Sequence, residues 1–275
     1  MAAYDVIVIG GGPGGYVAAI RAAQLGQKIA VVERDKAGGR CLNYACIPAK
    51  TVLHTAEVFS EVNGNGTDLG IKANGVSIDW KTVQSRRASV SKTLEDGVQM
   101  LWKKDKVDFL ADEASLEGGG KVKVGSDTHE AKAIIIATGS IELPIPGVEF
   151  SDRVIDTWGA WSLENLPKAL VVAGAGASGS EIASAYARLG TEVTLVEMLD
   201  RVLPLEDKDM ARVVERQFKK DGMEVLLGTK VEEVTEQKTG VKVKAGDKEL
   251  KARSEERRVG KECGYQCRSR WSPYH

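Results

Sequence analysis

The pattern of apolar residues predicts two strand–helix–strand units of similar design in different halves of the chain. Each unit begins with an uninterrupted apolar run, continues into a glycine cluster and an alanine-rich helix, and closes with a second apolar run. The predicted elements lie at 5–9, 16–25 and 28–32 in the first unit and at 170–173, 180–189 and 192–196 in the second. Uninterrupted apolar runs are typical of strands covered on both faces of a parallel sheet. An α/β fold is therefore predicted.

Weaker patterns surround the two units. Apolar residues at helical spacing predict a long helix over 80–104 with a packing face, and the residues of that face are Val83, Val90, Leu94, Val98 and Leu101. Short antiparallel strands are expected at 107–110, at 121–124 and before Ala131, followed by a buried strand at 133–136. The segment 141–147, with Pro144 and Pro146, is interpreted as the linker between two domains.

The second half ends with a similar arrangement. An amphipathic helix is predicted over 207–220, and its apolar residues are Met210, Val213, Val214 and Phe218. Strands are expected at 225–227, 231–234 and 241–244.

Both glycine clusters fit the pattern G-x-G-x-x-G, and both are followed by an acid. The glycines are Gly10, Gly12 and Gly15 in the first unit and Gly174, Gly176 and Gly179 in the second. Glu33 and Glu197 each stand 23 positions after the first glycine of their unit. Such glycines let backbone N–H groups approach a pyrophosphate at a helix N-terminus, and such an acid accepts hydrogen bonds from a ribose. The alternative is a glycine-rich turn that binds nothing.

Because strand, loop, helix, strand and acid recur in one order, the chain is predicted to contain two Rossmann-like, three-layer dinucleotide-binding domains. They would hold two dinucleotides, or one dinucleotide and a flavin. At the second site Glu197 favours NAD over NADP, since a 2′-phosphate would meet a like charge.

Two cysteines, Cys41 and Cys46, stand just after the first unit. The segment after Cys46 has a helical pattern, so the pair is expected at the start of a helix. A disulfide there would close a very short loop, gain little stability from loop entropy and be suited to exchange. The spacing alone leaves open that they are two incidental buried thiols.

Length and composition set broad limits. A chain of 275 residues suggests about two domains, and 43% hydrophobic residues is ordinary for a globular protein. No apolar run reaches the length of a membrane helix, and the first residues have no basic flank typical of a signal peptide. A cytoplasmic protein with redox chemistry is therefore expected, with no metal site.

The last residues, 253–275, are interpreted as a non-native tail. The residues from Arg253 to Cys263 can be encoded by a DNA string that resembles a common sequencing-library adapter, and Cys267 to His275 resembles its continuation. The alternative is a basic nucleic-acid-binding tail. Without its six basic and three acidic residues, the net charge of −1 becomes −4, so neither a nucleic acid nor a membrane is expected as a partner. A natural protein cut short near Ala252 is also expected.

The assembled motifs resemble those of the pyridine nucleotide–disulfide oxidoreductases. The matching stretches are Gly39-x-Cys41-Leu42-Asn43-x-x-Cys46-Ile47-Pro48-x-Lys50, Ala137-Thr138-Gly139-Ser140 and Val196-Glu197-x-x-Asp200-Arg201-x-Leu203-Pro204. Four residues depart from the pattern: Arg40 replaces a usual threonine, Tyr44-Ala45 replaces valine-glycine, and Ala177 stands where a tyrosine often covers the flavin.

The resemblance implies an FAD-binding domain at 1–146 with a redox disulfide, an incomplete NAD-binding domain at 147–252, and oxidation of dihydrolipoamide. The residues implied for the flavin are Gly10, Gly12, Gly14, Gly15, Glu33, Lys50, Ala114, Thr138, Gly139 and Ser140. Those implied for NAD are Gly174, Gly176, Gly179, Glu181, Glu197 and Val231. Cys46 would face the flavin as the charge-transfer thiolate and Cys41 would exchange with the substrate. Lys50 and Glu181 would form an ion pair beside the flavin, or else a surface pair of little energetic consequence.

The resemblance also implies partners and a missing part. The dithiol would be carried on a lipoyl domain of a 2-oxoacid dehydrogenase complex, and the full-length protein would be a homodimer. Its His–Glu base would come from a C-terminal interface domain of the other subunit, so the chain as written is expected to be inactive. His54 lies about 12 Å beyond Cys46 along a helix, too far to replace that base. The alternatives are a glutathione or mercuric reductase, or a flavin-binding module whose cysteines are structural.

Overall fold

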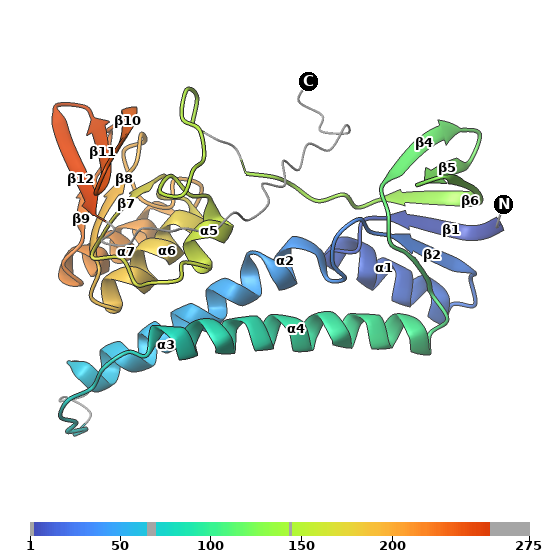
Figure 1. Cartoon of the computed structure of the whole chain (residues 1–275), viewed down its shortest axis with the longest axis horizontal. Coiled ribbons are helices and arrows are strands. Elements are labelled where there is room, and N and C mark those ends of the chain that lie inside the picture. The colour runs from blue at the N-terminus through green and yellow to red at the C-terminus, as the bar shows by residue number, and fades with distance from the viewer. Residues whose placement is uncertain (1–2, 65–69, 143–144, 254–275) are drawn as a thin grey trace.

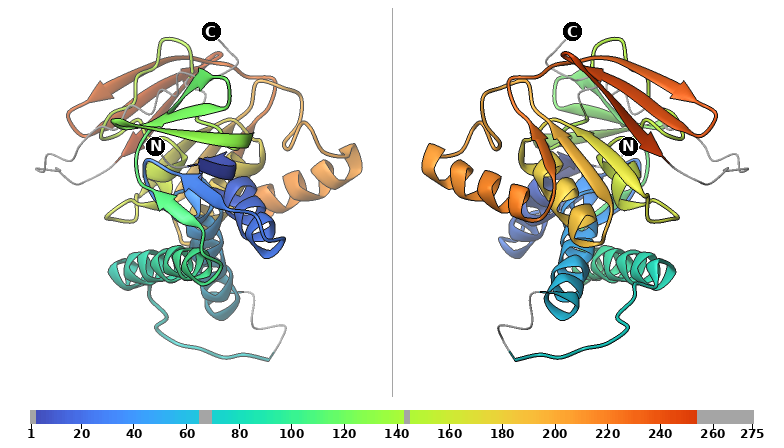
Figure 2. Two further views of the ribbon diagram at one scale, coloured as in Figure 1. Left: turned by 90° about the vertical axis from the view of Figure 1, so that its right-hand side faces the viewer. Right: turned by 90° about the vertical axis from the view of Figure 1, so that its left-hand side faces the viewer.

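The computed structural model describes residues 3–64, 70–142 and 145–253. The residues expected to form a non-native tail, apart from Arg253, lie outside the described part of the chain. Two lobes are joined along one side by two long helices, α3 (Cys46–Asn63) and α4 (Trp80–Lys104) (Figure 1). The end-on views place both helices below the sheets (Figure 2). No helix within the described ranges is long and apolar enough to cross a membrane.

The first lobe is built on a six-stranded sheet of order β3-β2-β1-β6-β5-β4. The strands are β1 (Ala3–Ile9), β2 (Ile29–Val32), β3 (Asp108–Leu110), β4 (Ala114–Gly118), β5 (Lys121–Val124) and β6 (Asp127–Ile136). The strands β3, β2, β1 and β6 are parallel, whereas β4, β5 and the start of β6 form an antiparallel meander. The expectation that 107–110 is antiparallel is therefore wrong, because β3 pairs in parallel with β2.

The second lobe has the same succession of parallel strands and antiparallel meander, but its strands form two separate three-stranded sheets. The strands β7 (Ala169–Ala173), β8 (Glu192–Val196) and β9 (Glu224–Leu226) are parallel, and β10 (Val231–Gln237), β11 (Gly240–Ala245) and β12 (Lys248–Arg253) form an antiparallel meander. The helices are α5 (Thr157–Trp161), α6 (Ala177–Arg188) and α7 (Lys208–Lys220). In this lobe the sequence patterns missed α5 and β12.

The two lobes repeat one another residue by residue around their glycine loops. Helix α1 (Pro13–Gln24) has the same length and the same position relative to its loop as α6. The meanders also correspond: Lys121 pairs with Glu130, and Lys242, at the equivalent position, pairs with Lys251. The chain therefore contains two copies of one α/β design, as the sequence predicted.

The largest hydrophobic core joins the two lobes. It contains Val52 and Ala56 of α3, Trp80 and Val83 of α4, and a larger set from the second lobe that includes Trp161, Ile182 and Tyr186. Two further cores lie in the first lobe on either side of its sheet. The first half of the chain thus supplies side chains to the core of the second lobe.

Several residues expected to be buried are exposed. On α4, Val83 and Val98 are buried, but Leu94 and Leu101 are not, because the two ends of the helix pack against different lobes. Ala133, Ile135 and Ile136 of β6 are exposed and Ile134 is half-buried, so the expectation of a buried strand at 133–136 is wrong. On α7, Met210 and Val213 are also exposed while Phe218 is buried. Among the described residues, no element covers these side chains.

Candidate functional site

The first glycine loop brings a strand end, a helix start and a second strand into close contact. A Cβ atom on Gly15 would lie 1.7 Å from the carbonyl oxygen of Gly10, and one on Gly10 would lie 2.1 Å from that of Ala137. Gly10 has a φ of 108°, which favours glycine. Helix α1 begins after Gly12 with no side-chain cap. Pro13 has no N–H and Gly15 N donates a 2.9 Å hydrogen bond to Gly12 O, so the N–H of Gly14 is the group of this first turn that can bind an anion such as a pyrophosphate.

The second glycine loop has the same geometry. A Cβ atom on Gly179 would lie 1.9 Å from the carbonyl oxygen of Gly174, whose φ is 98°. Helix α6 also begins without a side-chain cap, at Gly176, whereas α4, α5 and α7 are each capped by an aspartate. Both loops therefore fit a pyrophosphate by the same two features: backbone that no side chain shields and an uncapped helix N-terminus.

The two acids brace their loops in the same way. One carboxylate oxygen of Glu33 accepts a hydrogen bond of 2.8 Å from Gly11 N, and the other accepts one of 3.0 Å from Asp35 N. Glu197 accepts bonds of 2.7 Å from Ala175 N and 2.8 Å from Leu199 N. Because each carboxylate has about four acceptor sites, ribose hydroxyls can still be bound. The structure adds a role that the sequence did not predict, which is to hold the glycine loop in place.

Cys41 and Cys46 lie in contact at the start of α3. Cys41 belongs to a short helix, α2 (Gly39–Asn43), and Cys46 is the first residue of α3, where a thiolate is stabilised by the helix dipole. Both are free thiols, Cys46 is exposed and Cys41 is half-buried. Burial, together with a hydrogen bond to Cys46, raises the pKa of Cys41 to about 11. The structure thus represents the reduced form of the pair.

The predicted contact between Lys50 and Glu181 is present. Lys50 Nζ of α3 lies 2.5 Å from Glu181 Oε1 of α6, and the two side chains are 60% and 36% exposed. A pair this exposed contributes under about 1 kcal/mol to stability. The Lys50–Glu181 pair connects the helix that carries Cys46 with the second lobe.

The remaining predicted cofactor residues lie at equivalent places in the two lobes. Ala114 begins β4 and Val231 begins β10, and they pair with Val124 and Ala245 at matching positions. The Val231 side chain is buried in a core, so only its backbone can contact a ligand. Thr138, Gly139 and Ser140 follow β6 and are exposed beside the first glycine loop. Gly14 lies in the first turn of α1.

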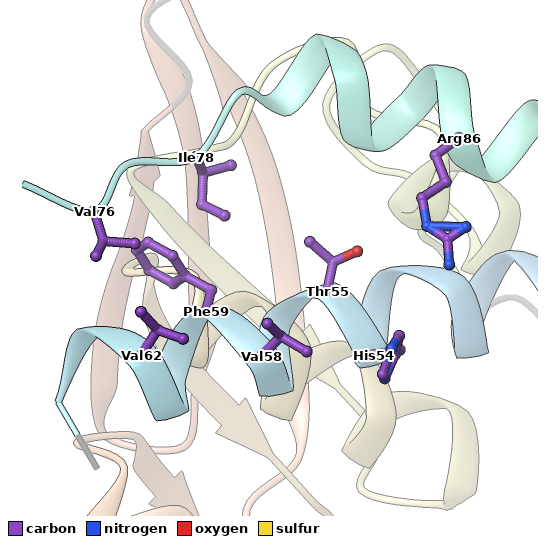
Figure 3. A pocket seen from close by; sticks show the side chains of 8 residues that line it. All are labelled: His54, Thr55, Val58, Phe59, Val62, Val76, Ile78 and Arg86. Carbon is purple, nitrogen blue, oxygen red and sulfur yellow. The ribbon is translucent and has the colours of Figure 1, made fainter. Parts of the chain in front are cut away.

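His54 lines a groove between α3 and α4 (Figure 3). The groove has a volume of about 370 Å³ and an apolar floor, and its lining residues are His54, Thr55, Val58, Phe59, Val62, Val76, Ile78 and Arg86. His54 Nδ1 lies 3.8 Å from Glu57 Oε2.

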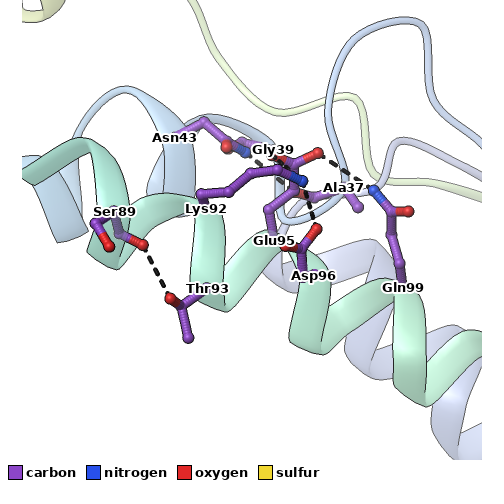
Figure 4. Close-up of polar contacts among 9 residues, drawn as sticks. All are labelled: Ala37, Gly39, Asn43, Ser89, Lys92, Thr93, Glu95, Asp96 and Gln99. Atoms are coloured by element: carbon purple, nitrogen blue, oxygen red, sulfur yellow. Dashed lines mark hydrogen bonds and ion pairs between the residues drawn. The ribbon is translucent and has the colours of Figure 1, made fainter.

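The segment that carries Cys41 is fixed by Asn43, whose hydrogen bonds were not predicted from the sequence. Asn43 Nδ2 donates hydrogen bonds of 3.0 Å to the carbonyl oxygens of both Ala37 and Gly39 (Figure 4). The polar face of α4, with its Lys92–Asp96 ion pair, lies beside this loop (Figure 4). Asn43 is buried, and a buried amide needs hydrogen-bond partners. The signal in the sequence that could have revealed this role is an asparagine close to two glycines, Gly38 and Gly39.

Two dinucleotide-binding lobes with a thiol pair between them define a class of proteins that pass electrons between a nucleotide cofactor and a disulfide. The comparisons with known proteins agree with this class. Residues 4–255 match the family described as pyridine nucleotide-disulphide oxidoreductase. The chain belongs to this family, as its motifs predicted.

Individual relatives point the same way. The chain is 41% identical over 243 residues to a dihydrolipoyl dehydrogenase of Geobacillus stearothermophilus, and 44% identical over 249 residues to dihydrolipoyl dehydrogenase 3 of Pseudomonas putida. These matches cover 87% and 88% of the chain but 52% and 53% of the relatives, so the chain spans about half their length.

Solved structures share the fold. The crystal structure of LpdA from Mycobacterium tuberculosis matches with a TM-score of 0.83 at 26% identity, over 92% of this chain and 57% of that one. The flavoprotein disulfide reductase RclA from Escherichia coli, as its Cu(II) complex, matches with a TM-score of 0.78 at 26% identity, over 92% and 55% of the two chains.

Proposed function

We propose that the protein to which this chain belongs is an FAD-containing, NAD-dependent enzyme that oxidises dihydrolipoamide to lipoamide. The observation that carries the proposal is the contact between the Cys41 and Cys46 thiols at the N-terminus of α3, between two dinucleotide-binding loops. The similarity to dihydrolipoyl dehydrogenases supports this choice of substrate.

The first lobe is assigned to FAD and the second to NAD. In the first lobe, the N–H of Gly14 would bind the pyrophosphate, Glu33 the ribose, and the exposed residues Thr138 to Ser140 the flavin end. In the second lobe, the amides after Gly176 and the carboxylate of Glu197 would do the same for NAD. Bound FAD would supply the two-electron chemistry that connects the thiol pair with NAD⁺.

The two cysteines have different roles in this proposal. When they are joined as a disulfide, a thiolate of dihydrolipoamide attacks the Cys41 sulfur and displaces the Cys46 sulfur, so that the substrate forms a mixed disulfide with Cys41. The second substrate thiol then attacks the substrate sulfur of this mixed disulfide and displaces Cys41, which leaves lipoamide and two protein thiols. The substrate loses two electrons and two protons, and the cysteine pair gains both. Cys46, stabilised as a thiolate by the dipole of α3, would face the flavin.

The cellular setting follows from the same assignment. We infer a cytoplasmic enzyme, homodimeric at full length, whose substrate is presented on a lipoyl domain of a 2-oxoacid dehydrogenase complex. The proposed division is an FAD-binding domain at 1–146 and an NAD-binding domain at 147–252. Lys50 and Glu181 are assigned to the flavin environment between them.

A dithionite titration with added FAD tests the proposal. The flavin-loaded protein is expected to develop long-wavelength absorbance after two electrons, since a thiolate at Cys46 then lies against the flavin. Cys46→Ser should abolish this absorbance, whereas the matched variant Cys41→Ser should retain it. Protein that binds FAD with unchanged spectra in both variants would instead be a flavin-binding module with structural cysteines.

A further inference from the structure

Tyr44, which lies between the two cysteines, anchors their loop to the second lobe. Its ring meets the ring of Trp158 edge-on, with centroids 5.0 Å apart and an interplanar angle of 84°. Its hydroxyl donates a 2.6 Å hydrogen bond to Asp35 Oδ2. Burial and this bond raise the pKa of Tyr44, so the hydroxyl stays protonated as a donor. A residue that departs from the family pattern therefore makes a specific contact on each side.

Trp158 is itself held firmly. It belongs to α5, whose N-terminus is capped by Asp156 through a 2.7 Å bond to Gly159 N. The buried guanidinium of Arg87 stands 4.9 Å from its ring centroid and donates a 2.7 Å hydrogen bond to Gln84 Oε1. Trp158 therefore offers Tyr44 a fixed partner that is supported from both α4 and α5.

A second departing residue of the segment is anchored as well. Arg40, directly before Cys41, forms an ion pair with Glu142 in the segment between the lobes. Although burial acts in the opposite direction, the hydrogen bond from Arg40 contributes to holding the pKa of Glu142 below its usual value. The short segment that contains both cysteines is thus fixed at Arg40 and at Tyr44.

We propose that Tyr44 is a positioning residue which, through Trp158, holds the reduced loop in the conformation that the Cys41–Cys46 disulfide requires. The proposal rests on the redox pair of the proposed function. The physical reason is that closing a disulfide costs loop entropy, and a loop already ordered by its neighbours has less to lose. The Tyr44–Trp158 contact therefore stabilises the disulfide relative to the dithiol.

The equilibrium with glutathione measures this effect without any cofactor. The two protein thiols reduce one glutathione disulfide: the pair loses two electrons and two protons and becomes the Cys41–Cys46 disulfide, and two glutathione thiols are formed. An aromatic edge contact contributes roughly 0.5–1.5 kcal/mol. Tyr44→Val is therefore expected to lower the oxidation constant about three- to tenfold, and a tenfold change corresponds to about 30 mV.

Three further variants make the test specific. Trp158→Leu, in the other lobe, should lower the constant by a similar factor, and the double variant should be lowered no further than either single one. Tyr44→Phe keeps the ring contact and should retain most of the wild-type constant. Phe150→Leu, at an exposed aromatic position, should leave it unchanged. Thermal melting of each variant verifies folding, and if Trp158→Leu does not fold, Tyr44→Val and Tyr44→Phe decide the question.

Two different results would contradict the positioning role of Tyr44 and the proposed function, respectively. If Tyr44→Val and Trp158→Leu remain folded and their oxidation constants stay within twofold of wild type, or rise, the positioning role is wrong. If the wild-type chain itself forms no Cys41–Cys46 disulfide with glutathione, the proposed function fails, because the substrate would have no disulfide to reduce.

Discussion

At the scale of single residues, the two cysteines differ in their surroundings. Cys41 is half-buried, and its thiol shares a hydrogen bond with Cys46, which is exposed at the start of α3. Burial is the largest cause of the raised pKa of Cys41, the contact with Cys46 adds to it, and the positive charge of Lys50 acts in the opposite direction. At neutral pH Cys41 is therefore a protonated donor rather than a nucleophile in the reduced, cofactor-free chain.

Alkylation measures this difference. In the reduced, flavin-free protein, iodoacetamide labelling of Cys41 should rise about tenfold per pH unit between pH 8 and 10, with a midpoint near the pKa of about 11. Because the folded pKa is raised above 9.0, the contribution of Cys41 to stability is present below pH 9 and is lost as the pH rises through 11. Mass spectrometry of each labelled peptide gives the profile.

The variant Cys46→Ala provides the control for this profile. It removes the hydrogen bond and the charge of Cys46 but leaves the burial of Cys41, so the midpoint should fall only part of the way towards 9.0. A wild-type midpoint at or below 9 would contradict the assignment.

At the scale of elements, the repeat extends to the turns that connect helices with strands. The turn after α4 contains Lys106, with a φ of 58°, and the equivalent turn after α7 contains Gly222, with a φ of 82°. The backbone bonds also correspond, from Val107 N to Trp102 O and from Met223 N to Phe218 O. One copy thus places a lysine where the other has the residue suited to the left-handed conformation.

Lys106→Gly is therefore expected to stabilise the protein. It relieves roughly 1–2 kcal/mol of left-handed strain in the folded state, and the greater entropy of glycine in the unfolded state costs about 0.5–1 kcal/mol, so the net gain in stability is up to about 1.5 kcal/mol. Urea unfolding would measure it. The reciprocal change Gly222→Ala should destabilise by a similar amount, since an added Cβ atom meets no other atom within 4 Å and only the φ angle matters. A destabilised Lys106→Gly variant would contradict this account.

The elements that the sequence predicted are those with strong local signals. The apolar runs, glycine loops and acids gave both nucleotide units, and helical spacing gave the bounds of α4 without error. The pattern missed α2, β4 and α5, which have only five residues each. It also missed β12, in which lysines and a glutamate surround two apolar residues. It also predicted that Ile135 and Ile136 are buried, whereas both are exposed, because a parallel strand was assumed to be covered on both faces.

The candidate site was predictable to a similar degree. The cysteines, the glycines and the Lys50–Glu181 contact were found from motif and spacing, and the structure brings them together. The bracing bonds of Glu33 and Glu197 and the contact of Tyr44 with Trp158 were not found, because they join residues far apart in sequence or depend on the loop conformation. Periodicity identifies a packing face but not the partner that covers it.

At the scale of the whole molecule, α3 connects the thiol pair with the core of the second lobe. Cys46 is at its first residue, and Val52 and Ala56 are buried among side chains of α6. Trp80 Nε1 of α4 adds a 2.9 Å bond to the carbonyl oxygen of Leu163. Side chains from the first half of the chain therefore form part of the core of the second lobe.

Val52→Ala should loosen the second lobe although Val52 is in the first half of the chain. Removing this fully buried side chain costs roughly 1–3 kcal/mol. Amide hydrogen exchange in α6 should accelerate accordingly. The matched variant Val31→Ala, also fully buried but in a core of the first lobe, should accelerate exchange in α1 and β2 and leave α6 unchanged. Equal exchange of α6 in Val52→Ala and wild type would show that the shared core does not couple the lobes.

The duplicated bracing of the glycine loops has a consequence for redesign. Because Glu33 and Glu197 hold their loops through the same pair of amides, neither loop distinguishes a flavin from a nicotinamide. That choice belongs to the segment after Glu33, where α2 and α3 have no counterpart in the second copy and α4, with 25 residues, is longer than its counterpart α7, with 13. An engineer who wished to recode the coenzymes would leave the loops intact and rebuild this segment.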